Sequence, residues 1–308
     1  MRCRTLGGLR VSAIGLGAMP LSIEGRPDEA RALATVHAAL DAGVTLLDTA
    51  DSYHLPGDEP GHNERLVAHA LATYGGDTAD VLVTTKGGRG RPADGTWTVN
   101  GSPRHLKAAA EASLKRLGLE AIGLYQLHKP DPAVPFEDSI GALRDLLDAG
   151  TIRLAGISNT TTDQIRRAHA ILGDRLASVQ NRYSPAVRDS DAELLLCAEL
   201  GLAFLPWSPL GGISRSSLDG PSSTGSPDGS QEGLEAFHAV ARERGVSPQQ
   251  VCLAWLSARS PTVIPIPGAS RPETARDSAG AADLLLSAAD LARLDTATDH
   301  RRPPLTGP

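Results

Sequence analysis

The sequence is poor in several residue types, and each shortage excludes a class of protein. Its three cysteines (Cys3, Cys197 and Cys252) are scattered without metal-ligand spacing, which favours small buried side chains over a disulfide framework or a metal site. No run of about 18 apolar residues suggests a membrane span. The first residues, Met1 to Thr5, lack the apolar core of a secretion signal. We therefore expect a cytoplasmic protein that does not act at a membrane.

Positive charge is scarce as well. The formal net charge of −6 at pH 7 gives no general attraction to nucleic acid or anionic lipid, so neither is expected as a partner. Only four of the thirty basic residues are lysines, and one of them, Lys86, follows the apolar run of residues 81–85. A charged ammonium at the end of a buried strand is costly unless it is paired or used in chemistry. Lys86 is therefore the first candidate functional residue.

What the chain has instead is a repeated pattern of short strands and longer helices. Its 308 residues, 41% of them hydrophobic, can bury a large core. Apolar or β-branched runs alternate with amphipathic segments that begin at capping residues and end at glycine. Eight such strands predict a single-domain α/β protein over residues 1–308, a (β/α)8 TIM barrel with right-handed crossovers after a short N-terminal β-hairpin. The predicted strands are residues 13–17, 44–48, 81–86, 122–128, 152–158, 178–180, 202–207 and 263–266.

Two long loops interrupt this alternation. Residues 211–233 are rich in Gly, Ser, Pro and Asp, and we interpret them as a mobile loop that crosses the active face. Residues 89–101 form a second long loop on the same face and include Trp97. A doubly wound dinucleotide-binding fold is the main alternative, because residues 15–20 begin like a phosphate-binding fingerprint. It is disfavoured, since Pro20 takes the place of the third glycine and no helix follows at once.

Four polar side chains follow neighbouring strands of the predicted barrel: Asp48, Tyr53, Lys86 and His128. Because the carboxyl ends of barrel strands meet at one face, these groups can converge. Each has a plainer explanation: Asp48 could bond loop amides, Tyr53 could lie on a surface loop, Lys86 could extend to solvent and His128 could donate to a carbonyl. All four explanations would have to hold together on adjacent strands. A shared functional site is the simpler interpretation.

The residue types indicate proton transfer to an oxygen atom. A phenol with a pKa near 10 is a poor acid at neutral pH. A neighbouring ammonium stabilises the phenolate and lowers that pKa, and a carboxylate holds the ammonium in place. A neutral imidazole can hydrogen-bond a substrate oxygen. Such a set delivers a proton to an oxygen that gains negative charge. It contains neither an activated serine or cysteine nor a metal cluster, so the missing reactant is a hydride donor.

Seven motifs resemble the aldo-keto reductase superfamily in order and spacing, over nearly the whole chain from Leu6 to Leu294. They are LDTADSY at 47–53, TTKG at 84–87, LYQLH at 124–128, GISN at 156–159, VQN at 179–181, WSPLG at 207–211 and PIPG at 265–268. The resemblance implies NADPH-dependent reduction of an aldehyde or ketone to the alcohol. It makes Tyr53 the general acid, Lys86 the group that tunes it, Asp48 the residue that holds Lys86, and His128 the residue that positions the carbonyl. Trp97 is a further predicted substrate contact.

The same resemblance implies that NADPH (NADP⁺) lies extended across the barrel mouth. Trp207 would stack on the nicotinamide, where many relatives have tyrosine. Ser270 and Arg271 would suit the 2′-phosphate, although Ser270 also fits a helix capping box. Asp277 and Ser278 depart from the Glu-Asn pair that relatives place against the adenine. The predicted cofactor contacts are Gly17, Ala18, Met19, Asp48, Ser158, Asn159, Gln180, Trp207, Ser208, Pro209, Leu210, Gly211, Gly268, Ser270, Arg271, Arg276 and Asp277.

Two alternative functions stay open at this stage. The first is a pyridoxal reductase, suggested by residues 17–19, by residues 208–212 and by the low aromatic content of 3%. The second is a non-catalytic, cofactor-binding regulatory subunit like the cytoplasmic β subunits of potassium channels. The short stretch before the first predicted strand disfavours such a docking role. A small-molecule carbonyl compound is the partner that we expect.

Overall fold

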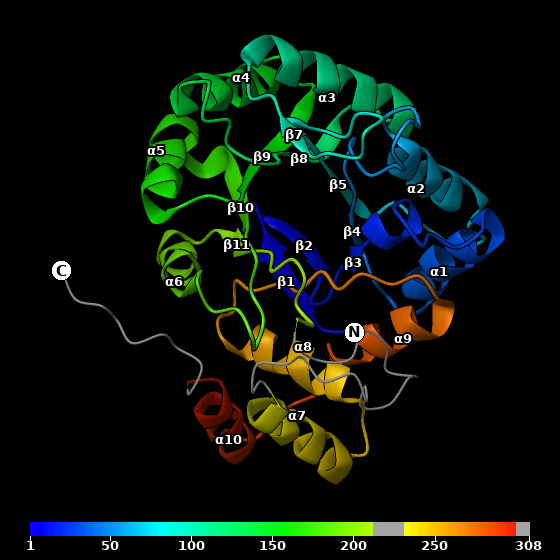
Figure 1. The fold of residues 1–308 in the computed structure, drawn as a ribbon, viewed down its shortest axis with the longest axis vertical. Coiled ribbons are helices and arrows are strands. Elements are labelled where there is room, and N and C mark those ends of the chain that lie inside the picture. Colours follow the sequence, from blue (N-terminus) through cyan, green and yellow to red (C-terminus); the bar gives the residue numbers. More distant parts are fainter. Residues whose placement is uncertain (212–230, 300–308) are drawn as a thin grey trace.

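The computed structural model describes residues 1–211 and 231–299. It opens with an antiparallel hairpin of β1 (Cys3–Leu6) and β2 (Leu9–Ser12), which turns at two glycines with positive φ, Gly7 and Gly8. Leu6 and Val11 of this hairpin pack in one buried cluster with side chains of the parallel strands. The predicted hairpin is therefore confirmed, and it lies inside the ring of helices in Figure 1. It closes one end of the barrel.

One parallel sheet of seven strands forms the body of the described structure. Its spatial order is the same as its order along the chain, and every neighbouring pair is parallel. Figure 1 shows the strands curled into a ring with the helices outside it. The strands are β3 (Leu16–Gly17), β4 (Leu46–Asp48), β5 (Leu82–Gly87), β8 (Ile122–Leu127), β9 (Ile152–Ser158), β10 (Leu176–Gln180) and β11 (Ala203–Phe204).

The prediction of a regular eighth strand at residues 263–266 is wrong. This segment joins its neighbours through isolated bridges, Phe204 to Val263 and Gly17 to Gly268. Ile264 N donates to Phe204 O and Gly15 N donates to Pro265 O, each at 2.9 Å. Proline has no N–H to donate, so Pro265 and Pro267 interrupt the ladder of hydrogen bonds. The barrel closes through these contacts, and the predicted (β/α)8 class is confirmed.

Helices surround the sheet, and several begin at the predicted residues. The side chain of Asp28 accepts from Arg31 N at the start of α1, and Thr161 and Gln164 form a capping box at α5. Helices α7 and α10 pack together outside the ring (Figure 1). None of the helices in the described ranges is long and apolar enough to cross a membrane. The helices are α1 (Glu29–Asp41), α2 (His62–Thr73), α3 (Pro103–Leu117), α4 (Phe136–Asp148), α5 (Thr162–Leu172), α6 (Asp191–Leu200), α7 (Gln231–Arg244), α8 (Pro248–Ala258), α9 (Pro272–Gly280) and α10 (Ala288–Asp299), with short 3-10 turns η1 (Met19–Leu21) and η2 (Gly173–Arg175).

Both predicted loops include residues that belong to regular secondary structure. Most of the loop at 211–233 lies outside the described residues, but its last residues begin α7, so its predicted end is wrong. The loop at 89–101 is not irregular throughout, because β6 (Arg89–Gly90) pairs with β7 (Thr98–Val99) as a short hairpin. Among the cysteines, Cys197 and Cys252 are buried as expected, whereas Cys3 is exposed on the hairpin.

Candidate active site

Lys86 lies near the carboxyl end of β5 and is fully buried. Its Nζ donates to Asp48 Oδ2 at 2.6 Å, to the carbonyl oxygen of Thr49 at 2.9 Å and to Tyr53 Oη at 3.1 Å. The three protons of the ammonium therefore have three acceptors in the protein. Three of the four residues predicted from separate strands and loops are thus in direct contact.

Asp48 ends β4, and its second carboxylate oxygen accepts hydrogen bonds from three other strands, the longest from Gln126 Nε2 of β8 at 3.4 Å. Thr84 Oγ1 donates to Asp48 Oδ1 at 2.8 Å and Gln180 Nε2 donates to the same oxygen at 2.9 Å. The carboxylate is buried, so an unpaired charge here would be costly. This network fixes the position of Asp48 and, through it, the position of the Lys86 ammonium.

Tyr53 is 7% exposed, and its environment favours the protonated phenol. Burial raises the pKa of Tyr53, and the nearby Lys86 ammonium lowers it, with a net shift above the ordinary value. The effect of Lys86 has the sign expected from the sequence, but burial outweighs it. Burial alone would lower the pKa of Lys86, but Asp48 and Tyr53 outweigh it, so that this pKa is raised. At neutral pH the pair is a charged ammonium beside a phenol that still carries its proton.

His128 follows β8 and completes the group. Its ring meets the ring of Tyr53 edge to face, with centroids 5.6 Å apart. Burial lowers the pKa of His128 well below its ordinary value, and the charges of Lys86 and Arg89 act in the same direction. The imidazole is therefore neutral at pH 7, as predicted from the sequence, and a neutral ring can still donate one hydrogen bond to a substrate oxygen.

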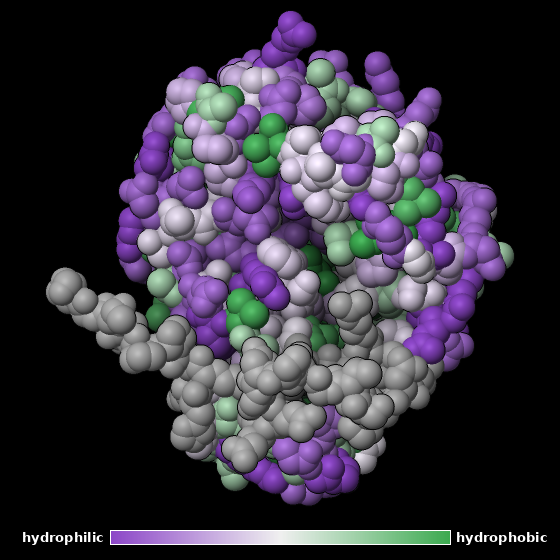
Figure 2. All heavy atoms as spheres, in the orientation of Figure 1, coloured by the Kyte–Doolittle hydropathy of each residue, from purple (hydrophilic) through white to green (hydrophobic). Residues whose placement is uncertain are grey.

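A pocket of about 240 Å3 lies in front of these groups, at the carboxyl end of the strands. Figure 2 shows the centre of this face as a hollow with hydrophobic atoms inside it. Lys86 lies behind the pocket wall and does not line it. The predicted site residues that line it are Gly17, Met19, Asp48, Tyr53, Trp97, His128, Ser158, Asn159, Gln180, Trp207, Ser208 and Gly268.

Three lining residues were not predicted: Pro20, Arg89 and Ile266. Pro20 follows the predicted Met19, and Ile266 lies in the PIPG motif with the predicted Gly268, so their place in the sequence was a usable signal. Arg89 lies three residues after Lys86, at the start of the β6–β7 hairpin. The only hint in the sequence was its place in a loop on the active face.

Two lining residues have a backbone conformation that non-glycine residues rarely adopt. Asn159 has φ 59° and Ser208 has φ 48°. Such conformations are concentrated at functional sites, where the surrounding structure enforces them. Asn159 Nδ2 donates to the carbonyl oxygen of His128 at 2.9 Å, and Trp207 Nε1 donates to Asn159 Oδ1 at 3.2 Å. Asn159 therefore links the His128 backbone to the Trp207 indole.

The wall formed by these residues suits a nicotinamide group. Trp207 is partly exposed, and its flat indole can stack on an aromatic ring. Ser158, Asn159 and Gln180 place a hydroxyl and two amides on the same pocket, and such groups can both donate to and accept from a carboxamide. Gly17 and Gly268 have a structural reason to be glycine. The two segments that contain them form a β-bridge at these residues, and a Cβ on Gly17 would lie 2.8 Å from the carbonyl oxygen of Ile266.

The other predicted cofactor residues do not line this pocket. Ser270 does not cap α9, since Arg271 holds the capping position and makes no side-chain cap, so the capping-box alternative is wrong. Asp277 accepts from Ser247 Oγ at 2.7 Å and from Gln250 Nε2 at 2.8 Å, which ties α9 to α8. The roles of all these residues in cofactor binding stay predictions. The residues concerned are Ala18, Pro209, Leu210, Gly211, Ser270, Arg271, Arg276 and Asp277.

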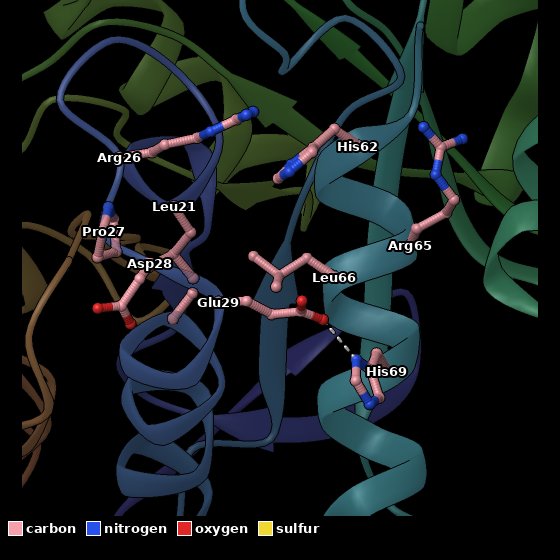
Figure 3. Close-up of a pocket in the computed structure, with 10 residues that line it drawn as sticks. Leu21, Arg26, Pro27, Asp28, Glu29, His62, Arg65, Leu66 and His69 are labelled. Carbon is pink, nitrogen blue, oxygen red and sulfur yellow. Dashed lines mark hydrogen bonds and ion pairs between the residues drawn. The ribbon is translucent and has the colours of Figure 1, made fainter. Parts of the chain in front are cut away.

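A larger hollow, of about 540 Å3, lies between α1 and α2 (Figure 3). It contains none of the predicted site residues. Three of its lining side chains have ionisable partners: Arg26 forms an ion pair with Asp58 at 3.0 Å, and His69 contacts Glu29 at 2.9 Å across the hollow. It combines neither a buried acid with a buried base nor an aromatic wall. The smaller pocket beside Tyr53 is therefore the candidate active site.

Asp51, two residues before Tyr53, is expected to make the stability of this region depend on pH. It is buried, and its Oδ1 has no hydrogen-bond partner among the described residues. Burial raises the pKa of Asp51 to about 8, and the nearby carboxylate of Glu64 adds to the shift. The folded protein therefore keeps this proton at pH values where the unfolded chain has lost it. The free energy of unfolding should fall as pH rises from about 4 to about 8, by at most ~1.4 kcal/mol per pH unit.

The variant Asp51→Asn, which is neutral at every pH, should lose this slope. Relative to the wild type it is expected to gain about 2–4 kcal/mol of unfolding free energy between pH 5 and pH 8. Urea denaturation at the two pH values measures the difference. The matched control is Glu111→Gln, at an exposed position on α3. If the wild type and Asp51→Asn change in parallel over this range, Asp51 is ionised in the folded protein.

Comparisons with known proteins agree with this geometry. The model of the Aldo/keto reductase family matches residues 13–299. An uncharacterized oxidoreductase of Schizosaccharomyces pombe, C215.11c, is 32% identical over 294 residues, which cover 94% of this chain and 88% of that protein. Among solved structures, the glycerol dehydrogenase AKR11B4 of Gluconobacter oxydans has a TM-score of 0.84 at 25% identity and covers 99% of this chain and 98% of its own.

Two further solved structures have the same fold over nearly the full length. The thermostable aldo-keto reductase Tm1743, in complex with epalrestat, has a TM-score of 0.79 at 26% identity, with 96% of this chain and 100% of that chain covered. The holo form of the aldo-keto reductase AKR11C1 of Bacillus halodurans has a TM-score of 0.76 at 27% identity, with 98% and 100% covered.

Proposed function

Since this chain belongs to the aldo/keto reductase family and is an oxidoreductase, we propose that it reduces an aldehyde or ketone to the alcohol with NADPH. One observation carries the proposal: the Lys86 ammonium contacts both Asp48 Oδ2 and Tyr53 Oη behind a pocket that His128 also lines. The family generally uses a nicotinamide cofactor, and the Trp207 wall suits one. The bound cofactor would supply the hydride to the carbonyl carbon.

The side chains of this protein would orient the carbonyl group and protonate its oxygen atom. Neutral His128 donates a hydrogen bond to that oxygen and so orients the substrate. Tyr53 transfers the proton of its Oη to the same oxygen as negative charge develops there. Lys86 stabilises the resulting phenolate, and Asp48 keeps the ammonium in place. Positioned proton donors of this kind contribute about 10²–10⁴-fold in rate.

The other wall residues would bind the cofactor. Ser158, Asn159 and Gln180 would hydrogen-bond the carboxamide of the nicotinamide, and Trp207 would stack against its ring. Asn159 has a second role, since its bonds to the His128 backbone and to Trp207 connect the cofactor wall with the substrate wall. The buried Asp48–Lys86 pair lies behind the proton donor. Together, the residues of the site would bind the cofactor, orient the carbonyl group and protonate its oxygen.

A substrate panel tests the proposal directly. Pyridoxal, aryl aldehydes, small diketones and sugar aldehydes are offered with NADPH, and the consumption of NADPH is followed by its absorbance. Turnover of pyridoxal alone would identify a pyridoxal reductase. Tight cofactor binding without turnover of any member would contradict the proposal and favour the regulatory-subunit alternative.

The preference for NADPH is expected to depend on Arg271, which precedes α9. A guanidinium at a helix start suits the 2′-phosphate, which NADH lacks. Arg271→Ala should weaken the binding of NADPH by about tenfold and leave that of NADH nearly unchanged. Cofactor fluorescence titrations measure both dissociation constants. Arg276→Ala is the matched control, since the predicted adenine contact is common to both cofactors. Equal losses for both cofactors in Arg271→Ala would remove this residue from the 2′-phosphate role.

A further inference from the structure

The side chain of Arg89 brings a positive charge to the wall of the active-site pocket. It lines the same pocket as Tyr53 and His128 and is partly buried. Within residues 1–211 and 231–299 its guanidinium has neither an ion pair nor a hydrogen bond, and its Nε is buried without a partner. An arginine that is partly desolvated and unpaired is unusual, because the guanidinium group offers five donors.

The neighbouring Arg91 shows how the charge of an arginine is paired in the same loop, although its Nε is also buried without a partner among the described residues. Its Nη1 donates to the carbonyl oxygen of His54 at 2.8 Å, and its Nη2 pairs with Glu24. Both guanidinium groups stack on Trp97, at 4.6 Å for Arg89 and 4.8 Å for Arg91 from the ring centroid. Arg91 therefore anchors the loop to the barrel. Arg89 makes no such contact, so its charge has no counter-charge among the described residues.

The fold holds Arg89 in place without pairing its charge. The β6–β7 hairpin sets Arg89 opposite Val99 and brings Trp97, just before β7, against its guanidinium. The charge acts on both Tyr53 and His128, since it tends to lower the pKa of each. The guanidinium lines the same pocket as these two groups, which would contact the carbonyl oxygen.

The rest of the pocket offers Arg89 no counter-charge. Asp48 is the one acidic residue among the described residues that line it, and Asp48 is paired with Lys86. Because Lys86 neutralises Asp48 from behind the pocket wall, the charge of Arg89 stays uncompensated, and an uncompensated positive charge attracts anions. Arginine pairs strongly with carboxylates and phosphates, often through two parallel hydrogen bonds.

We infer that Arg89 makes this site selective for aldehydes or ketones that carry an anionic group, a carboxylate or a phosphate, close to the reacting carbonyl. The inference rests on the proposed reductase function and specifies its substrate class. Arg89 would hold the anionic group while His128 and Tyr53 contact the carbonyl oxygen. Trp97 would keep the guanidinium plane in position.

Matched pairs of aldehydes test this with the holoenzyme. Succinic semialdehyde is compared with butanal for the carboxylate, and glyceraldehyde 3-phosphate with glyceraldehyde for the phosphate. We expect kcat/KM of at least one charged member to exceed that of its neutral partner by about 10- to 100-fold. The pair with the larger ratio identifies the anion. Ratios near one in both pairs would overturn the inference, while turnover of the neutral aldehydes would still support the reductase function.

Two variants assign the preference to Arg89. Arg89→Gln should bring the ratio close to one, and Arg89→Lys should retain part of it. The control Arg10→Gln removes the same charge from an exposed position on β2 and should keep the wild-type ratio. If Arg89→Gln lowers kcat/KM equally for both members of a pair, then Arg89 acts on Tyr53 and not on the substrate, and the inference fails.

A binding measurement keeps the test independent of turnover. In the wild-type protein loaded with NADP⁺, benzoate and benzamide are titrated while the intrinsic fluorescence is followed, to which Trp97 and Trp207 of the pocket wall contribute. Benzoate should bind about tenfold more tightly than benzamide. Equal affinities, or a preference for benzoate that Arg89→Gln leaves intact, would overturn the assignment of Arg89.

Discussion

Removing the hydroxyl group of Tyr53 should lower kcat/KM for carbonyl reduction by about 10²–10⁴-fold in the Tyr53→Phe variant, because the proton donor is lost. Cofactor binding should be retained, since the nicotinamide wall consists of other residues. The phenol accepts one of the three hydrogen bonds of the Lys86 ammonium, and Asp48 and Thr49 still accept the other two. The fold should therefore survive the change. Steady-state kinetics with an aldehyde that the wild type reduces, together with NADPH titration, measures both effects.

The matched control for this variant is Tyr74→Phe. Tyr74 follows α2 as its C-cap residue, does not line the pocket, and its hydroxyl donates to Asp41 Oδ1 at 2.8 Å. It loses a hydroxyl hydrogen bond just as Tyr53 does, but it should keep wild-type kinetics. If the Tyr53→Phe variant retains more than about a tenth of wild-type kcat/KM, another group protonates the oxygen.

Replacing Lys86 by methionine should have the largest effect on stability. Lys86 is fully buried and pairs with buried Asp48, so Lys86→Met leaves a carboxylate without its counter-charge. Loss of one partner of such a pair costs about 3–5 kcal/mol of unfolding free energy. Carbonyl reduction should fall as well, because the phenolate of Tyr53 loses its stabilising charge. Denaturant unfolding and steady-state kinetics follow the two effects.

A second substitution separates the structural effect from the chemical one. Lys86→Met combined with Asp48→Asn removes both charges, so it should recover part of the lost stability but none of the activity. The control is Lys107→Met, which breaks an exposed pair with Asp145 at 2.7 Å and should cost about 1 kcal/mol or less. Recovery of activity in the double variant would mean that the ammonium is not needed for turnover.

The fold could be predicted because its signals are local and repeated. Each β/α unit has its own strand pattern, capping residue and terminal glycine, as at Asp28 for α1 and at Gly118 for α3. The eighth strand was the exception, and the reason was also visible in the sequence: Pro265 and Pro267 cannot donate to a ladder. The pattern of apolar residues predicted a strand there, whereas the missing N–H groups left only bridges.

The convergence of Asp48, Tyr53, Lys86 and His128 was predictable from barrel topology alone, because strand ends meet at one face whatever the intervening helices are. The electrostatic balance was not. A nearby ammonium lowers the pKa of a phenol, but the burial of Tyr53 has the larger effect, and burial is a property of the packed structure. The high pKa of Asp51 has the same origin.

The sequence by itself determined the order of strands and helices, the closed barrel and the identity of the polar groups at its mouth. These features depend on hydrophobic periodicity, capping residues and chain order, which are local properties of the sequence. Only the tertiary structure decided which charges are neutralised. Arg89 and Arg91 look alike in the sequence, yet Arg91 contacts His54 and Glu24 while Arg89 faces the pocket. The pairing of a charge depends on atoms brought together from distant segments, and no local pattern encodes that proximity.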